Sequence, residues 1–127
     1  MSLSVRIWIP DENAHAGRRL LDDPPRTGTS AGSEFTRHQL WGSTAARRLG
    51  ATFLPQLGEI TLENRGNLMI PPDRLDAFEQ ECRHLAEHAG ELAAATGYEP
   101  GYITDRLATI RNAVDRARAA NGSILIW

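Results

Sequence analysis

Apolar residues in the second half of the chain recur at the spacing of two amphipathic helices. Across residues 72–96 they follow one another at steps of three and four, and they are Leu75, Phe78, Cys82, Leu85, Ala89 and Leu92. Across residues 101–120 the same rhythm gives Ile103, Leu107, Ile110, Val114 and Ala117. Steps of three and four place side chains on one face of a helix. Because the connection between the two segments is short, we expect an antiparallel helix pair.

Both ends of the chain show the pattern of strands. Val5, Ile7 and Ile9 alternate with other residues near the start, which is the two-residue period of a strand. Residues 123–127 form an apolar run that ends in Trp127 and is too short for a helix. A continuous run of this kind is typical of a strand inside a sheet. We expect the two segments to pair, which would bring the ends of the chain together.

The segments between these ends give weaker signals. Residues 34–41 are interpreted as another strand, and Ser43 as the N-cap of a short helix that Pro55 ends. Residues 59–71 resemble a β-hairpin, because an alternating arm is followed by turn-forming residues and a short apolar arm. Residues 10–34 are rich in Pro, Gly, Ser and Thr and are interpreted as a long surface loop, a kind of segment that often carries function.

These elements together predict an α+β fold in a single domain that spans residues 1–127. We expect a small mixed or antiparallel sheet of about four or five strands that includes both termini. The antiparallel helix pair would cover one face of this sheet. The sequence leaves the order and direction of the strands open.

Composition and charge restrict the function. The chain has 127 residues, a net charge of −2 and one cysteine, so no internal disulfide can form and a reducing compartment fits best. All 14 basic residues are arginine, which excludes lysine chemistry and suggests a GC-rich bacterial genome. There is no secretion signal and no apolar stretch of about 20 residues, so we expect a cytoplasmic protein without a membrane partner. The arginines of residues 101–120 do not converge on one face, so nucleic acid is not expected as a partner.

A polar stripe on the first predicted helix carries the candidate chemistry. It consists of Glu81, His84, His88 and Glu91, spaced 3, 4 and 3 residues apart. Two histidines at i and i+4 can share one metal ion, so these four residues are metal candidates. The same four residues could instead form the rim of a protein interface. Trp41 stands before a Gly-Ser turn and is a further partner-binding candidate, because exposed tryptophans are frequent in interfaces.

The functional hypothesis follows from what these patterns contain. No catalytic residue set or cofactor motif is found, so the leading interpretation is a small non-enzymatic protein-interaction module. Immunity proteins, antitoxins and regulatory adaptors have this kind of build. The alternative is a small metal-binding protein or enzyme that uses the polar stripe or the 10–34 segment. A protein partner is expected, its identity is open, and a homodimer is left open.

Overall fold

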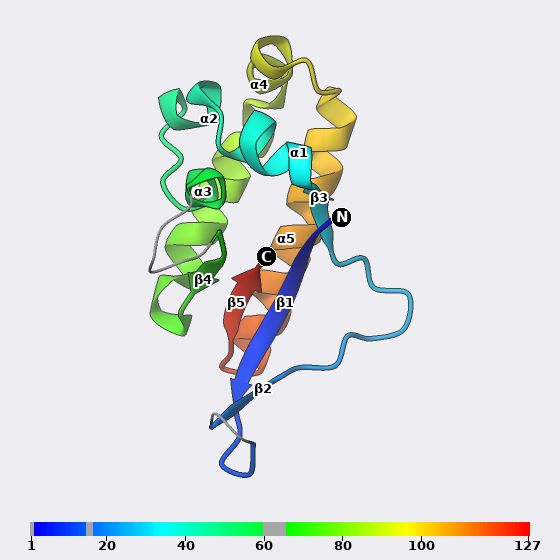
Figure 1. The fold of residues 1–127 in the computed structure, drawn as a ribbon, viewed down its shortest axis with the longest axis vertical. Helices are drawn as coiled ribbons and strands as arrows, with labels where there is room; N and C mark the ends of the chain where they lie inside the picture. Colours follow the sequence, from blue (N-terminus) through cyan, green and yellow to red (C-terminus); the bar gives the residue numbers. More distant parts are fainter. Residues whose placement is uncertain (1, 15–16, 60–65) are drawn as a thin grey trace.

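The sheet is antiparallel throughout and contains both ends of the chain. The computed structural model describes residues 2–14, 17–59 and 66–127. Within these residues the strands are β1 (Ser2–Pro10), β2 (Arg18–Leu20), β3 (Ser30–Ser33), β4 (Leu68–Ile70) and β5 (Ser123–Ile126). Their order is β2-β1-β5-β4, and β3 pairs with the start of β1. The two ends of the chain therefore lie side by side, as expected from the sequence (Figure 1).

The pairing of the first and last strands is confirmed residue by residue. Ile7 lies opposite Ile124 and Val5 opposite Ile126, in antiparallel register. The ladder extends beyond β5, because the backbone of Trp127 exchanges two hydrogen bonds with Ser4, at 2.8 and 3.2 Å. β5 is an interior strand, since β4 pairs with its other edge. One face of β5 is fully buried and the other is half-buried.

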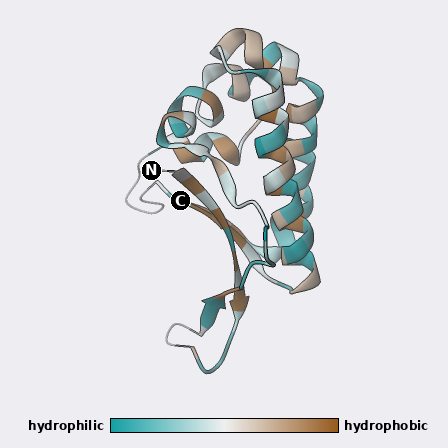
Figure 2. Ribbon diagram, turned by 90° about the vertical axis from the view of Figure 1, so that its right-hand side faces the viewer, coloured by the Kyte–Doolittle hydropathy of each residue, from teal (hydrophilic) through white to brown (hydrophobic). Residues whose placement is uncertain are grey.

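Helices account for most of the remaining described residues. They are α1 (Glu34–Thr36), the π-helix η1 (Arg37–Trp41), α2 (Thr44–Arg48), the 3-10 helices η2 (Leu54–Gly58) and η3 (Pro72–Arg74), α3 (Leu75–Glu87), α4 (Ala89–Thr96) and α5 (Pro100–Ala119). The apolar side chains of α3 and α5 predicted to share one face are buried in a single core that also contains the inward-facing side chains of β1 and β5. The structure thus has the α+β fold expected from the sequence, with the long helices on one side of the sheet (Figure 2).

Ion pairs join the two long helices at one end. Arg118, near the end of α5, approaches Asp76 and Glu79 near the start of α3, each at 2.6 Å. These contacts bring the last turn of α5 to the first turns of α3, as an antiparallel arrangement requires. The hydrogen bond from Arg118 holds the pKa of Glu79 below its ordinary value, because it stabilises the ionised carboxylate.

Three local predictions are corrected by the structure. Residues 34–41 are helical rather than a strand, because the Ser33 side chain and Thr36 form a capping box that starts α1. The helix predicted over residues 72–96 is interrupted at His88, which lies between α3 and α4. The 10–34 segment is not one loop, since it contains β2 and β3.

Two further predictions concern residues 43–71. Ser43 caps α2 as expected, since its hydroxyl accepts a hydrogen bond from the Ala46 amide at 3.1 Å. α2 ends at Arg48, well before Pro55, which instead begins the 3-10 helix η2 with Leu54. In the predicted hairpin, β4 confirms the second arm, whereas residues 60–65 lie outside the described residues.

Candidate functional site

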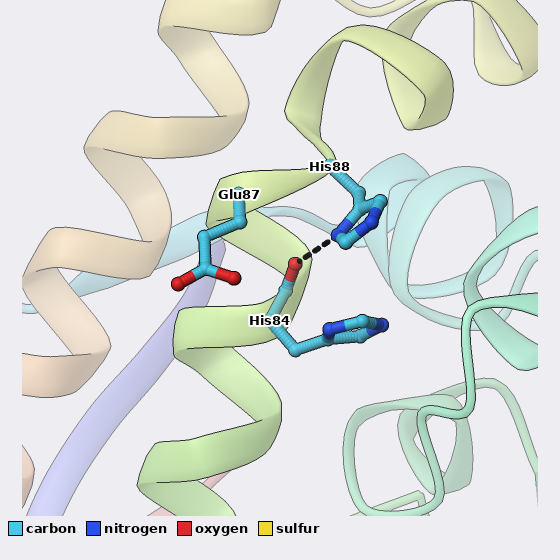
Figure 3. Close-up of side chains that lie close together, drawn as sticks. All are labelled: His84, Glu87 and His88. Carbon is cyan, nitrogen blue, oxygen red and sulfur yellow. Dashed lines mark hydrogen bonds between the residues drawn. The ribbon is translucent and has the colours of Figure 1, made fainter.

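The structure brings the two predicted histidines together at the end of α3. His84 lies in the last turn of α3, and His88 follows its final residue, so the two rings stand one helical turn apart. Their centroids are 4.3 Å apart and the ring planes are inclined by 46°. His84 is exposed and His88 half-buried. Figure 3 shows both rings on the same side of the helix.

A backbone hydrogen bond fixes the proton on one of the rings. Nδ1 of His88 lies 2.9 Å from the carbonyl oxygen of His84. A carbonyl oxygen can only accept, so Nδ1 of His88 carries the hydrogen in this contact. The neutral ring therefore keeps its lone pair on Nε2, which is the arrangement that histidine ligands of metals commonly show.

Glu87 joins the histidines in place of the two predicted glutamates. One ligand atom each of His84, Glu87 and His88 lies within 4.8 Å of the others. In Figure 3 the Glu87 carboxylate points away from the rings. The spacing His-x-x-Glu-His could have identified Glu87 from the sequence, because some zinc enzymes use it on a helix. Within the described residues, no further Cys, His, Asp or Glu belongs to this group.

Glu81 has a different role from the one predicted. Its carboxylate accepts hydrogen bonds from the backbone N–H groups of Thr52, Phe53 and Leu54, the last two at 3.0 and 2.8 Å. These amides stand at the start of η2, where a short helix leaves N–H groups without an internal partner. Glu81 therefore holds residues 52–54 against α3 by hydrogen bonds. If its carboxylate bound a metal ion instead, these amides would lose their acceptor.

Glu91 is separated from the histidines by the break at His88. It is exposed on α4 and lines a shallow cavity of about 170 Å³ with Arg48, Leu49 and Ala95 among its other walls. The four residues predicted to form one polar stripe therefore have three different roles. His84 and His88 form a pair, Glu81 caps η2, and Glu91 lines a cavity.

Trp41 is not available to a partner. Its side chain is completely buried, and its indole N–H donates to the carbonyl oxygen of Ala31 at 2.9 Å. The prediction that Trp41 contacts a partner is therefore wrong, because the π-helix η1 turns this side chain inward, whereas the expected strand and turn would have left it outside.

The 10–34 segment contributes a structural ion pair at the edge of the sheet. Asp23 approaches Arg6 of β1 at 3.3 Å and Arg116 of α5 at 2.9 Å. This carboxylate thus links the sheet to the helical layer. The backbone of the segment also follows β1, since the Val5 amide donates to the Thr29 carbonyl at 2.7 Å. These contacts hold the segment against the sheet, so its described part is not a free loop.

Arg37 and Cys82 are buried groups that could perform chemistry, but Arg37 is held by hydrogen bonds and Cys82 is packed in the core. Arg37 is almost completely buried and donates to the carboxylate of Glu34 at 3.0 Å and to the carbonyl oxygen of Leu57 at 3.1 Å. This contact with Arg37 holds the pKa of Glu34 below its ordinary value. Burial raises the pKa of the Cys82 thiol, so this cysteine is a packed core residue rather than a nucleophile.

The outer face of the sheet is the surface that sequence reasoning missed. Cross-strand partners share a face, so the register Arg6–Leu125–Met69 places these three side chains opposite the core. Trp8 and Trp127 follow on the same face by alternation. Met69 is 40% exposed and Trp127 37%, two of the three exposed large hydrophobic residues in the described chain. We call Arg6, Trp8, Met69, Leu125 and Trp127 the outer face.

An arginine from β2 borders the outer face. The Arg18 guanidinium lies 4.0 Å from the centre of the Trp8 ring, and the Arg18 side chain is exposed. Beside them is a cavity of about 270 Å³, lined by Trp8, Pro10, Arg18 and Pro72 among others. The indole nitrogen of Trp8 is buried without a hydrogen-bond partner in the described structure. This end of the sheet therefore combines an aromatic ring, a cavity and a positive charge that has no ion-pair partner among the described residues.

Comparison with family models, with curated proteins and with solved structures finds no match to this chain. None of the helices in the described ranges is long and apolar enough to cross a bilayer.

Proposed function

We propose that this chain is a non-enzymatic protein-interaction module that binds its partner with the outer face of the sheet. The observation that carries the proposal is the asymmetry of the sheet. Long helices cover one face (Figure 2). Met69 and Trp127, which the register assigns to the other face, are exposed to solvent. Apolar side chains that gather on one exposed surface mark interaction sites more often than scattered ones do.

The charges of the strands support a partner with acidic residues around an apolar contact. The five described strands contain three arginines, at positions 6, 18 and 19, and no Asp or Glu. Asp23 neutralises Arg6, and Asp11 approaches Arg19 at 3.1 Å. Arg18 lies over the Trp8 ring and forms no ion pair with a described residue, and thus remains available to an acidic group. Complementary charge at the rim of an interface speeds association and selects the partner.

The same charge distribution argues against a partner formed by a second copy. If two copies packed with their outer faces together, both Arg18 side chains, which have no ion-pair partner among the described residues, would lie in the same interface. Like charges in an interface oppose association. We therefore propose a different protein, with a function of the immunity, antitoxin or regulatory-adaptor type in a bacterial cytoplasm. The single reduced cysteine and the arginine-only basic residues support this compartment and source.

The experiment compares two variants of the outer face with two matched controls. Met69→Glu places a charge in the apolar surface, and Phe35→Glu makes the same change at an exposed hydrophobic residue on α1. Arg18→Glu reverses the free charge, and Arg48→Glu reverses an exposed arginine on α2. Immobilised wild-type protein is used to retrieve proteins from an extract of the source cells, and each retrieved protein is then purified and titrated with all four variants.

The expected result is a partner that binds Met69→Glu and Arg18→Glu at least about tenfold more weakly than wild type, since central interface residues contribute more than about 1 kcal/mol. Phe35→Glu and Arg48→Glu should bind as wild type does. The proposal is contradicted when no retrieved protein depends on the outer face, or when the controls weaken binding as much as the outer-face variants.

A further inference from the structure

We propose that His84 and His88 form a binding site for a borderline divalent transition-metal ion such as Zn²⁺, with Glu87 as a third ligand after rotation of its side chain. This site lies in the helical layer rather than on the outer face, so it goes beyond the proposed protein-binding function and stands independently of it.

The first argument is the spacing of the two imidazoles. Their ring centroids are 4.3 Å apart, which is close enough for one ion at about 2.0–2.1 Å from a nitrogen of each ring. Residues four apart lie on the same face of a helix, so the backbone itself sets this separation.

The second argument is the hydrogen bond that prepares His88. Because its Nδ1 donates to the His84 carbonyl oxygen at 2.9 Å, Nε2 is the ring nitrogen that can bind a metal. A backbone carbonyl on the non-ligating nitrogen also orients the ring and raises the basicity of the ligand. The half-buried position of His88 restricts the ring further, so of the two imidazoles it is His84 that has to adjust to the ion.

The third argument is the charge around the pair. Glu87 and Glu91 are both exposed carboxylates within three residues of His88, and neither forms an ion pair with a described residue. Arg83, the nearest arginine along α3, pairs with Glu79 at 2.6 Å. Neither carboxylate is therefore taken up by an ion pair with a described residue. Glu87 is the carboxylate whose oxygen lies within 4.8 Å of the imidazole nitrogens, so it is the one that can reach the ion.

The ligand set selects the class of metal. Two imidazoles and one carboxylate suit Zn²⁺, Cu²⁺ or Ni²⁺, whereas Mg²⁺ and Ca²⁺ prefer oxygen ligands. With three protein ligands at most, water would occupy the remaining positions. The ion would join the last turn of α3 to His88, which precedes α4, and so restrain the break between these helices.

The experiment titrates tag-free protein with ZnCl₂ by isothermal calorimetry in a buffer that does not chelate metal. We expect one Zn²⁺ per chain, tighter binding of Cu²⁺, and no binding of Mg²⁺. His84→Ala and His88→Ala should each weaken Zn²⁺ binding at least about tenfold, since even outer-shell partners of a metal contribute that much. His38→Ala, which removes an exposed histidine from η1, serves as the matched control and should bind Zn²⁺ as wild type does.

A second measurement keeps the test valid if a variant is poorly folded. Nitrogen NMR of wild-type protein labelled at histidine should show His88 protonated at Nδ1 before Zn²⁺ is added, and perturbation of the His84 and His88 rings alone afterwards. Absence of Zn²⁺ binding by wild-type protein, or wild-type Zn²⁺ affinity in both His84→Ala and His88→Ala, overturns the site. Unchanged Zn²⁺ affinity in Glu87→Gln overturns the carboxylate's part in it.

Discussion

Replacement of Glu81 tests whether this residue is the cap described above. The side chain reaches from α3 to the start of η2, and its carboxylate accepts three consecutive backbone N–H groups, from Thr52, Phe53 and Leu54. Glu81→Ala removes every one of these hydrogen bonds. Glu81→Gln has a side chain of nearly the same shape and keeps one acceptor oxygen, but it removes the negative charge.

The expected magnitude follows from how exposed these amides are. A hydrogen bond to a charged group contributes about 1.5–3 kcal/mol to stability, so loss of three such bonds at a buried site would greatly lower the free energy of unfolding. Thr52 is exposed and Phe53 half-buried, so water can replace part of the carboxylate's contribution. Loss of a helix cap costs about 0.5–2 kcal/mol, and the upper end of this range applies because one group serves three donors. We expect Glu81→Ala to lower the free energy of unfolding by about 2 kcal/mol and Glu81→Gln by about half as much.

Urea unfolding monitored by circular dichroism measures this change, with Glu91→Ala as the matched control. Glu91 is an exposed glutamate on α4 without a hydrogen bond or ion pair among the described residues, so its removal should change stability by less than about 0.5 kcal/mol. Hydrogen exchange locates the effect, because the Phe53 and Leu54 amides should lose protection in Glu81→Ala. A Glu81→Ala protein as stable as Glu91→Ala, with these amides still protected, would refute the capping role.

Three further predictions concern the helix pair, the π-helix and the core. In Arg118→Ala, chemical unfolding should show a smaller loss of stability between about pH 5 and pH 3. The lowered pKa of Glu79 adds to the free energy of unfolding at pH values above the ordinary pKa of 4.5, and this contribution is lost as the pH falls through the lowered pKa. Trp41→Phe should cost about 1–3 kcal/mol in urea unfolding, because it leaves a void and the Ala31 carbonyl without its donor, and should leave partner affinity unchanged. Cys82 should react with a disulfide reagent only after denaturation, since its thiol is buried and its pKa raised; rapid reaction in native protein would contradict this.

The elements predictable from the sequence are those with strong periodicity. Ile7 and Ile124 share the core because each lies in a segment with a regular apolar pattern, and such patterns depend only on neighbours in the chain. The two long helices follow for the same reason. The break at His88 was missed because the apolar steps continue through it from Leu85 to Ala89, so periodicity contains no trace of the interruption.

The candidate site was predictable only in part, because its roles depend on contacts distant in sequence. The histidine pair follows from i, i+4 spacing on one helix. The role of Glu81 depends on amides of residues 52–54, some 27–29 positions earlier, which no local pattern connects to it. The outer face requires the register of three strands, and only that register shows Met69 beside Leu125. Sequence patterns thus located the candidate residues better than they assigned the residues' roles.

Photo-crosslinking from the outer face tests the central claim most directly. A benzophenone side chain is placed in separate proteins at Trp127 or at Phe35, and each protein is irradiated in an extract of the source cells. We expect a single defined adduct from position 127, its yield reduced at least about tenfold by Arg18→Glu, and none from position 35, because the partner contacts the sheet and not α1. An adduct from position 35 alone, or none from position 127, would contradict the assignment of the outer face as the binding surface.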